Sequence, residues 1–303
     1  MPCLLLLMFA SAAAFASGPP DDFAIESVAP GVFVHTGRHG TVDSSPRDDQ
    51  ANLAFIVGEN CVAVIDSGGS VAVGQRWRDA IRARTAVPIC YVINSHVHFD
   101  HVLGNAAFRA DKPRFVGHAR LAEAMEGNRE FFAEEFAAEV GSEGSAAVVG
   151  PDLLVEESME IDLGGRVLEL RAVPPAHTDT DLVVRDSASG ILFTGDLVFM
   201  ERIPALDASV RGWLKWLNEE SAAGHARIVP GHGPAAAPWP EGGAALQRYL
   251  STLVTETRAA VADGVFLEDA KGSVGDGERD RWQFFDEVHR RNVSRAYREL
   301  EWE

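Results

Sequence analysis

Three histidines and one aspartate fall within six residues of this chain, at His96, His98, Asp100 and His101. In an extended segment, side chains two positions apart point the same way, so the imidazoles of His96 and His98 can converge on one cation. Asp100 and His101 follow where the chain turns, and adjacent residues there point in different directions. The cluster predicts a metal ion with a second ion beside it, since a solvated polar turn seldom gathers these residue types.

Three later segments each supply one more side chain that can bind a metal. These side chains are His177, Asp196 and His232, and each follows a β-rich run and has small neighbours. We expect each of them in a turn at a strand end, where a small neighbour lets the backbone approach a metal closely. Together the segments offer more ligands than one tetrahedral ion accepts, so we expect two metal ions per chain.

The surrounding segments predict the elements that hold these residues. Three β-rich runs at residues 32–36, 52–57 and 61–65 precede a helix at 70–84 and a buried strand at 89–93. This β-α-β order indicates a parallel crossover, and it places the first histidine cluster at the carboxyl end of a strand, where open α/β sheets bind ligands.

A second round of strands and helices follows a predicted helix at residues 119–140. Two sheets packed face to face with helices outside, an αββα sandwich of the α/β class, fit this order. We expect a single domain over residues 17–303. The predicted elements are strands at 159–163, 167–173, 182–185, 191–194 and 228–229, and helices at 209–222, about 242–262 and 279–300.

Residues 1–16 predict a signal peptide, because an apolar run is followed by small residues that end in Ala14-Phe15-Ala16. We therefore expect a periplasmic or secreted protein. The leader lacks a Lys or Arg near its start, so a misplaced start codon is the alternative. No later segment has the roughly 20 apolar residues of a membrane-spanning helix, so we expect no membrane insertion.

The net charge of -18 and the absence of a basic run argue against nucleic acid as a partner. We expect a small-molecule substrate and interpret the acidity as a solvated surface.

After cleavage of the leader, Cys61 and Cys90 would remain, each at a predicted buried strand. They could pair in an oxidising compartment, but neighbouring strands rarely meet disulfide geometry, so the pattern favours two inert core thiols.

Together, the motifs His-x-His-x-Asp-His, His-Thr, Gly-Asp and Gly-His-Gly occur in this order over about residues 32–234. This arrangement resembles the metallo-β-lactamase superfamily, and the resemblance implies its four-layer αββα fold. It also implies a ligand set: a first metal ion held by His96, His98 and His177, a second by Asp100, His101 and His232, and both bridged by Asp196.

The resemblance implies two zinc ions per chain, with iron or manganese as alternatives. A water shared by two cations is deprotonated near neutral pH and can attack a carbonyl-type carbon. We expect Asp100 to orient this hydroxide and to carry its proton. No separate serine or cysteine nucleophile is then needed.

The aspartate at position 196 restricts the classes of substrate that we expect. Typical β-lactamases of this superfamily have cysteine or no ligand there, so the site resembles glyoxalase II and the lactonases, which implies hydrolysis of an ester, thioester or lactone. A β-lactam hydrolase and an iron-dependent oxidoreductase resembling persulfide dioxygenases are the alternatives. The segments 193–199, 201–204 and 209–214 resemble the quinoprotein relay system zinc metallohydrolases. That resemblance implies a functional link to quinoprotein dehydrogenases.

Several other residues have a structural interpretation that competes with a functional one. We interpret Arg202 as a surface or packing residue, although it could bind a substrate carboxylate. His118 is expected to be structural, and Asn105 to stabilise its turn. Trp213 and Trp216 have helical spacing and are expected in the core.

Overall fold

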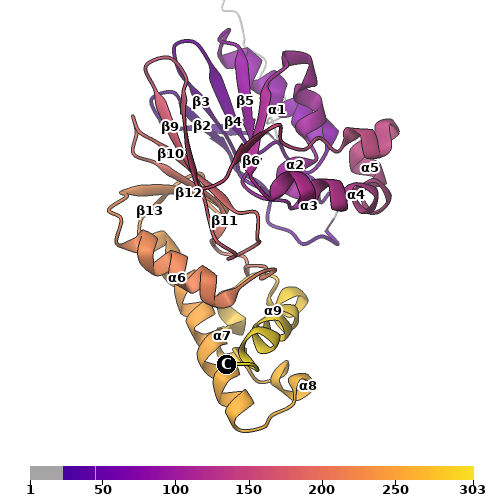
Figure 1. Ribbon diagram of the computed structural model, residues 1–303, viewed down its shortest axis with the longest axis vertical. Helices are drawn as coiled ribbons and strands as arrows, with labels where there is room; N and C mark the ends of the chain where they lie inside the picture. The colour runs from indigo at the N-terminus through magenta and orange to yellow at the C-terminus, as the bar shows by residue number, and fades with distance from the viewer. Residues whose placement is uncertain (1–22, 45) are drawn as a thin grey trace, which may run out of the picture.

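The computed structural model describes residues 23–44 and 46–303, so the predicted signal peptide lies outside the described residues. Two mixed β-sheets pack face to face, and helices cover their outer surfaces (Figure 1). This confirms the predicted αββα architecture. In the described part of the chain, no helix combines the length and apolar character needed to cross a lipid bilayer.

The first sheet is antiparallel from β1 to β4 and parallel from β4 to β7, which confirms the predicted β-α-β crossover. The second sheet is antiparallel except for the parallel pair β11 and β12. In spatial order, the first sheet contains β1 (Ile25–Ala29), β2 (Val32–His35), β3 (Leu53–Val57), β4 (Val62–Ile65), β5 (Ile89–Ile93), β6 (Arg114–His118) and β7 (Leu153–Val155). The second contains β13 (Ala237–Pro238), β12 (Arg227–His232), β11 (Leu192–Phe199), β10 (Leu182–Asp186), β9 (Val167–Ala172) and β8 (Ser158–Asp162).

The helices lie outside the sheets and in a C-terminal group that extends beyond them (Figure 1). The α-helices are α1 (Val71–Arg84), α2 (Phe99–Val102), α3 (Leu121–Gly127), α4 (Arg129–Glu135), α5 (Ala137–Val140), α6 (Val210–Ser221), α7 (Ala244–Ala262), α8 (Leu267–Ala270) and α9 (Phe285–Leu300). Short 3-10 helices are η1 (Asn105–Asp111), η2 (Gly141–Ala147), η3 (Glu241–Gly243) and η4 (Asp276–Arg281).

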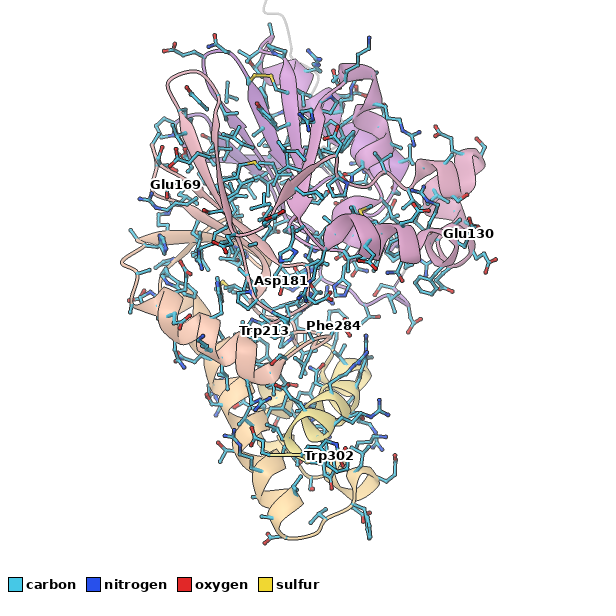
Figure 2. The ribbon with its side chains drawn as sticks, in the orientation of Figure 1. Glu130, Glu169, Asp181, Trp213, Phe284 and Trp302 are labelled. Carbon is cyan, nitrogen blue, oxygen red and sulfur yellow. A yellow bond between two sulfur atoms is a disulfide. The ribbon has the colours of Figure 1, made fainter. Side chains whose placement is uncertain are left out.

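Three large apolar clusters hold these layers together. One lies between the two sheets, a second packs the first sheet against α1, and a third joins the second sheet to α6, α7 and α9. Trp213 and Trp216 belong to the third cluster, as expected. Trp213 lies between α6 and the second sheet, and its indole donates a hydrogen bond to the Leu197 carbonyl at 2.9 Å (Figure 2). The C-terminal helices therefore share a core with the second sheet.

The prediction of one continuous helix over residues 119–140 is wrong. The segment forms three short helices, α3 to α5, with breaks at Asn128 and Phe136, whose ψ angles are 2° and 36°. Asn128 follows Gly127, and both residue types have weak helix propensity. The breaks turn successive apolar side chains toward the small cluster around α2 instead of along one straight helix.

The interpretation of Cys61 and Cys90 as inert thiols is also wrong, because the two residues form a disulfide bond. Cys61 directly precedes β4, and Cys90 lies in the neighbouring parallel strand β5. The register of this strand pair shifts at Val62, and the two Cα atoms lie 5.5 Å apart, which is within disulfide reach. The sequence could not reveal this local register.

The half-buried Arg166 and the buried Asp186 form an ion pair that ties β9 and β10 to the first sheet. Two nitrogens of Arg166 bond Asp186 at 2.6 and 2.9 Å, and a third bonds the carbonyls of Pro30 and Val57. Burial alone would raise the pKa of Asp186, but the guanidinium and Ser189 outweigh it and hold this pKa below its usual range.

We expect Asp186→Asn to lower the free energy of unfolding by about 3 kcal/mol at pH 7, because it leaves the mostly enclosed guanidinium of Arg166 without its carboxylate partner. The depressed pKa means that the stabilisation is present above the unfolded carboxyl's pKa of about 4 and is lost as the pH falls through the folded value. Urea unfolding at several pH values measures this, with the exposed Asp152→Asn as the control. An equal loss at pH 7 and at low pH would contradict the assignment.

Candidate metal centre

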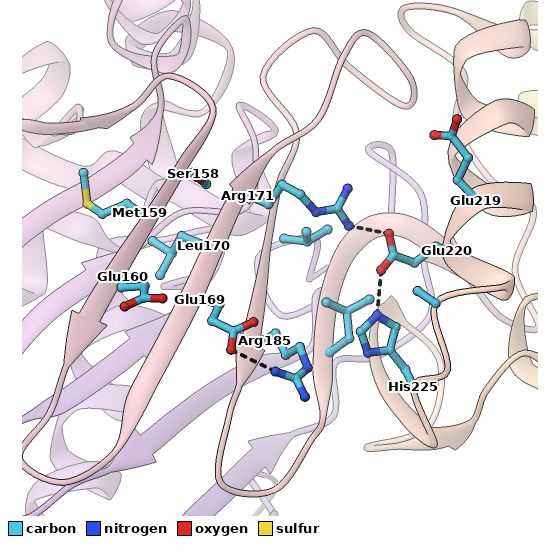
Figure 3. A pocket seen from close by; sticks show the side chains of 13 residues that line it. Ser158, Met159, Glu160, Glu169, Leu170, Arg171, Arg185, Glu219, Glu220 and His225 are labelled. Carbon is cyan, nitrogen blue, oxygen red and sulfur yellow. Dashed lines mark hydrogen bonds and ion pairs between the residues drawn. The ribbon is translucent and has the colours of Figure 1, made fainter.

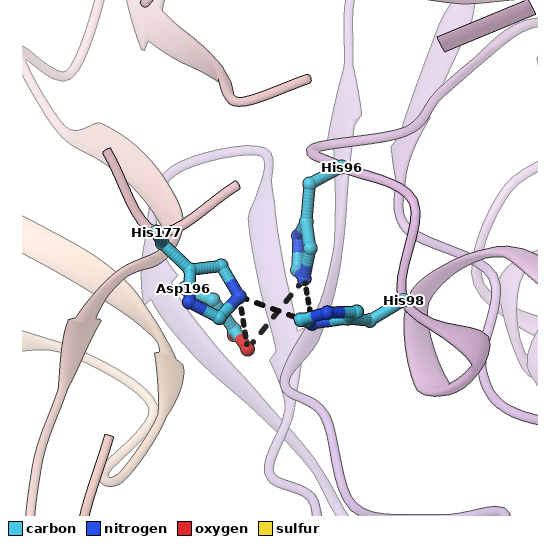
Figure 4. Close-up of side chains that lie close together, drawn as sticks. All are labelled: His96, His98, His177 and Asp196. Atoms are coloured by element: carbon cyan, nitrogen blue, oxygen red, sulfur yellow. Dashed lines mark hydrogen bonds and ion pairs between the residues drawn. The ribbon is translucent and has the colours of Figure 1, made fainter. Parts of the chain in front are cut away.

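The first ligand cluster consists of His96, His98, His177 and Asp196, whose side chains converge on one point (Figure 4). Their candidate ligand atoms all lie within 4.8 Å of one another. His96 Nε2 and His177 Nε2 lie 3.1 and 3.0 Å from His98 Nδ1. The loop after β5 supplies the first two histidines, and His177 follows β9. Residues separated by about eighty positions thus meet at one place.

The second ligand cluster consists of Asp100, His101 and His232, again with ligand atoms within 4.8 Å of one another. Asp100 and His101 lie in α2, and His232 is the last residue of β12. Asp100 Oδ2 lies 3.4 Å from His232 Nε2 and 3.7 Å from His101 Nε2. The structure therefore brings together all seven side chains that the sequence singled out.

Asp196 belongs to the first cluster but also borders the second, and it turns one carboxylate oxygen toward the histidines of each. Its Oδ2 is 3.6 Å from His96 Nε2 and 3.5 Å from His177 Nε2. Its Oδ1 is 3.2 Å from His101 Nε2 and 3.3 Å from His232 Nε2. A carboxylate in this position can coordinate two cations at once.

Unsatisfied polar atoms support metal binding at this centre. Asp196 Oδ1 and His101 Nε2 are both buried, and within the described residues neither makes a hydrogen bond of good geometry. Unsatisfied buried groups of this kind are costly, and a cation would satisfy them. Imidazole nitrogens and carboxylate oxygens are ligands that zinc and other divalent metals accept, so these side chains fit two divalent metal ions.

Hydrogen bonds on the opposite ring nitrogens hold three of the five histidines with Nε2 toward the centre. His96 Nδ1 lies 3.0 Å from Ser95 Oγ, and His177 Nδ1 lies 2.6 Å from the Ala205 carbonyl. The Nδ1 atom of His232 lies 2.9 Å from the Gln50 carbonyl. Such partners select the tautomer and orient the ring for coordination.

Two carboxylates that the sequence analysis missed orient the remaining histidines. Asp66 Oδ2 lies 2.8 Å from His101 Nδ1, and Asp207 Oδ2 lies 2.9 Å from His98 Nε2, so His98 alone presents Nδ1 to the centre. Asp66 directly follows β4, at the same carboxyl edge of parallel strands as the histidine cluster. Its position after a buried strand was a usable signal, whereas nothing in the sequence marks Asp207.

Mutual charge interactions shift the pKa values of the clustered side chains. Burial opposes ionisation of Asp196, but His232, His101 and His96 outweigh it and hold the pKa of Asp196 well below its usual range. Burial and neighbouring histidines lower the pKa of His96 strongly and that of His177 to about 4. Burial lowers the pKa of His101, but the carboxylates of Asp196, Asp100 and Asp66 outweigh it and raise this pKa well above its usual value, and Asp207 likewise raises that of His98. The ionised Asp196 and the neutral His96 and His177 are therefore ready to bind a metal, whereas a cation would compete with a proton at His101.

Asp196 does not lie in a turn, which corrects the expectation for this residue. It lies inside β11, which extends to Phe199. The register against β12 shifts on both sides of Gly195, whose φ is +50°. A side chain on Gly195 would collide with Ser95, with a Cβ contact of 2.6 Å. Glycine thus permits a bulge that aims Asp196 into the centre.

A cavity of about 480 Å³ opens onto both clusters and has an aromatic wall. Phe131, Phe132 and Phe136 contribute to this wall, and Phe131 is 55% exposed. The loop after β2 closes another side, and its Arg47 bonds Glu139 at 2.8 Å and lies over the Phe136 ring. The loop between β2 and β3 is therefore fastened to α4 and α5 through the ion pairs of Arg47 with Glu135 and Glu139.

Arg202 lines this cavity and is not a surface residue. It is 8% exposed, and its Nε has no hydrogen-bond partner among the described residues. Burial lowers the pKa of Arg202, although the carboxylates of Asp100 and Asp196 oppose this effect.

His118 and Asn105 have the structural roles expected. His118 Nδ1 accepts a hydrogen bond from the Arg120 amide, and the Asn105 side chain donates hydrogen bonds to Asn94 and to the Val149 carbonyl.

A larger hollow of about 740 Å³ lies on the outer face of the second sheet (Figure 3). Most of its charged side chains already pair with one another. Glu220 bonds His225 Nε2 at 2.7 Å and also pairs with Arg171, and Arg185 bonds Glu169 at 2.9 Å. Neither ligand cluster borders it, so the smaller cavity is the candidate active site.

We expect Asp207→Asn to weaken binding of the first cation by about 10- to 100-fold, because the carboxylate orients His98 and increases its basicity. Competition with a zinc chelator measures this affinity. Asp179→Asn, an exposed carboxylate on the loop after His177, is the matched control. Equal affinities in the two variants would show that Asp207 does not position His98.

Comparisons with known proteins agree with this geometry. The family model described as the metallo-beta-lactamase superfamily matches residues 46–232. No curated protein matches by sequence. A solved metallo-beta-lactamase from Pontibacter korlensis is similar with a TM-score of 0.58 and 19% identity, over 75% of this chain and 95% of that one.

A stereoselective inverting sec-alkylsulfatase from Pseudomonas sp. is also similar, with a TM-score of 0.66 and 15% identity. The match covers 91% of this chain and 50% of that one. Identities this low show a shared fold. With the matching family model and two buried clusters consistent with a binuclear centre, the chain belongs to the metallo-beta-lactamase superfamily, as a metallohydrolase.

Proposed function

We propose that this protein is an exported zinc hydrolase that cleaves an ester, thioester or lactone. The observation that carries the proposal is the position of Asp196, whose two carboxylate oxygens face two separate ligand clusters. Two cations bound there would act as Lewis acids and lower the pKa of a shared water toward neutrality. The seven clustered side chains are the proposed ligands.

The residues of the cavity have distinct proposed roles. Asp100 lines the cavity, where its carboxylate can accept the proton of the attacking water and return it to the leaving group. The phenylalanine wall can bind an apolar part of the substrate and exclude bulk water. Asp196 in place of cysteine is the reason to prefer these substrates over a β-lactam.

Export is proposed from the leader, and the disulfide between Cys61 and Cys90 supports it, because such bonds persist in oxidising compartments. Sequencing the N-terminus of protein from the periplasm or the medium tests this. Mature cytoplasmic protein that begins at Met1 would contradict it. The proposed link to quinoprotein dehydrogenases rests only on the resemblance of segments around residues 193–214.

Elemental analysis combined with a substrate panel tests the proposed reaction. We expect two zinc equivalents per chain and turnover of an ester, a thioester or a lactone. The panel includes a chromogenic cephalosporin and a secondary alkyl sulfate. A stoichiometry that stays at one under metal-replete conditions would contradict the binuclear centre. Bound iron together with oxidation of a persulfide would favour the iron-dependent oxidoreductase. Cephalosporin as the best substrate would favour the β-lactam hydrolase.

A further inference from the structure

A basic hollow lies on α9 in this otherwise acidic protein. It has a volume of about 430 Å³ and is lined by Lys271, Arg290, Arg291, Ser294, Arg295 and Arg298. Five of these six side chains are cations, although the chain as a whole carries a net charge of -18. The basic hollow is therefore a local reversal of the charge that dominates the chain.

The positive charge of the basic hollow is only partly neutralised. Asp207 pairs with Arg291, lies 3.8 Å from Arg295 and also bonds His98. Lys271 pairs with the exposed Glu268 at 2.6 Å. Among the described residues, the Arg298 side chain makes no ion pair or hydrogen bond, and Arg290 has only a longer-range attraction to Glu268. Excess charge of this kind attracts an anion.

The basic hollow adjoins the candidate active site. Arg291 lines the basic hollow, the cavity over the metal centre, and a third hollow that contains His98 and Phe131. Along α9, Arg298 lies about 10 Å beyond Arg291 at a rise of 1.5 Å per residue. A ligand held at the metal centre could therefore extend past Arg291 and reach the other cations.

Helix stability alone does not explain this arrangement. A cation in the last turn, such as Arg298, is favoured by the helix dipole. Arg290 and Arg291 lie in the middle of α9, where that effect has faded. Asp43 and Glu287 line the cavity itself, so a negatively charged group is better accommodated in the basic hollow than beside the cleaved bond.

We propose that the substrate carries a carboxylate or phosphate group remote from the cleaved bond, and that the basic hollow binds this group. The inference rests on the proposed function and names its substrate class. The cleaved bond lies at the metal centre, an apolar part contacts the phenylalanine wall, and an anionic end lies along α9.

Three aryl acetates test the inference, each with a hexyl chain on the ring that ends in a carboxylate, a phosphate or an uncharged amide. At low salt, we expect kcat/KM for the esters with an anionic end to be at least about fivefold that for the amide. This ratio corresponds to the binding energy that two exposed ion pairs would contribute. The ratio between carboxylate and phosphate identifies the preferred group. Calorimetry with the matching aryl ethers, which cannot be hydrolysed, measures the same preference without turnover.

The variant Arg290→Gln with Arg298→Gln removes two cations that contact neither Asp207 nor the ligand clusters. We expect the preference for an anionic end to disappear in both kcat/KM and ether binding. Arg114→Gln on β6, which is similarly exposed, is the control for a general change in charge, and it should keep the preference.

The two measurements separate failure of this inference from failure of the proposed function. Ester cleavage without any anionic preference, or a preference that survives the double substitution, overturns the basic hollow as a binding site. Ether binding that depends on Arg290 and Arg298, without cleavage of any ester, thioester or lactone of the panel, leaves the anion site in place and overturns the proposed reaction.

Discussion

Replacing Asp196 with alanine is expected to lower kcat/KM by roughly three orders of magnitude, because one side chain contacts both cation sites. The second cation should be lost more readily than the first, since His96, His98 and His177 remain as a complete set of three imidazoles. Elemental analysis after dialysis, together with turnover of the best ester, measures both effects. Folding should be largely retained, because the side chain belongs to the centre and not to an apolar cluster.

The variant Asp196→Cys separates bridging from simple ligation. A thiolate can still bind the second cation, but it favours one cation per ligand, so metal content should recover further than activity. The stability control is the unfolding midpoint of Asp196→Ala in urea, which should stay close to that of the parent protein. If Asp196→Ala binds two metal equivalents and turns over normally, Asp196 does not bridge.

Asp100→Asn is expected to lower kcat by roughly a hundred- to ten-thousandfold, the range for losing a general acid or base. The amide keeps a neutral oxygen close to His232 Nε2, so the second cation should bind more weakly but should still saturate at high zinc concentration. Rates measured at saturating zinc therefore report proton transfer and not metal loss.

The matched control for this substitution is Asp43→Asn, which removes another carboxylate from the same cavity without touching a ligand cluster. Its effect on kcat should be small. A normal kcat at saturating zinc would assign Asp100 to metal binding alone.

The sequence alone determined most of the secondary structure of this protein and the identity of its candidate metal ligands. Alternation of apolar residues and helical periodicity depend on neighbours in the chain, so most strands and the helices α1, α6 and α7 were predicted close to their observed bounds. The seven clustered residues could be found because each has a chemically distinctive side chain after a β-rich run. Their order along the chain also indicated the fold.

The tertiary structure decided how distant segments meet. The register shifts beside Gly195 and Val62 determine where Asp196 points and whether Cys61 reaches Cys90, and both depend on pairing with another strand. Asp207 becomes the partner of His98 only because the chain before α6 folds back over the histidine loop. The cations of α9 likewise form a hollow next to the metal centre only after that helix packs against α7. Such relations join residues that are far apart in the chain, and local propensity carries no information about them.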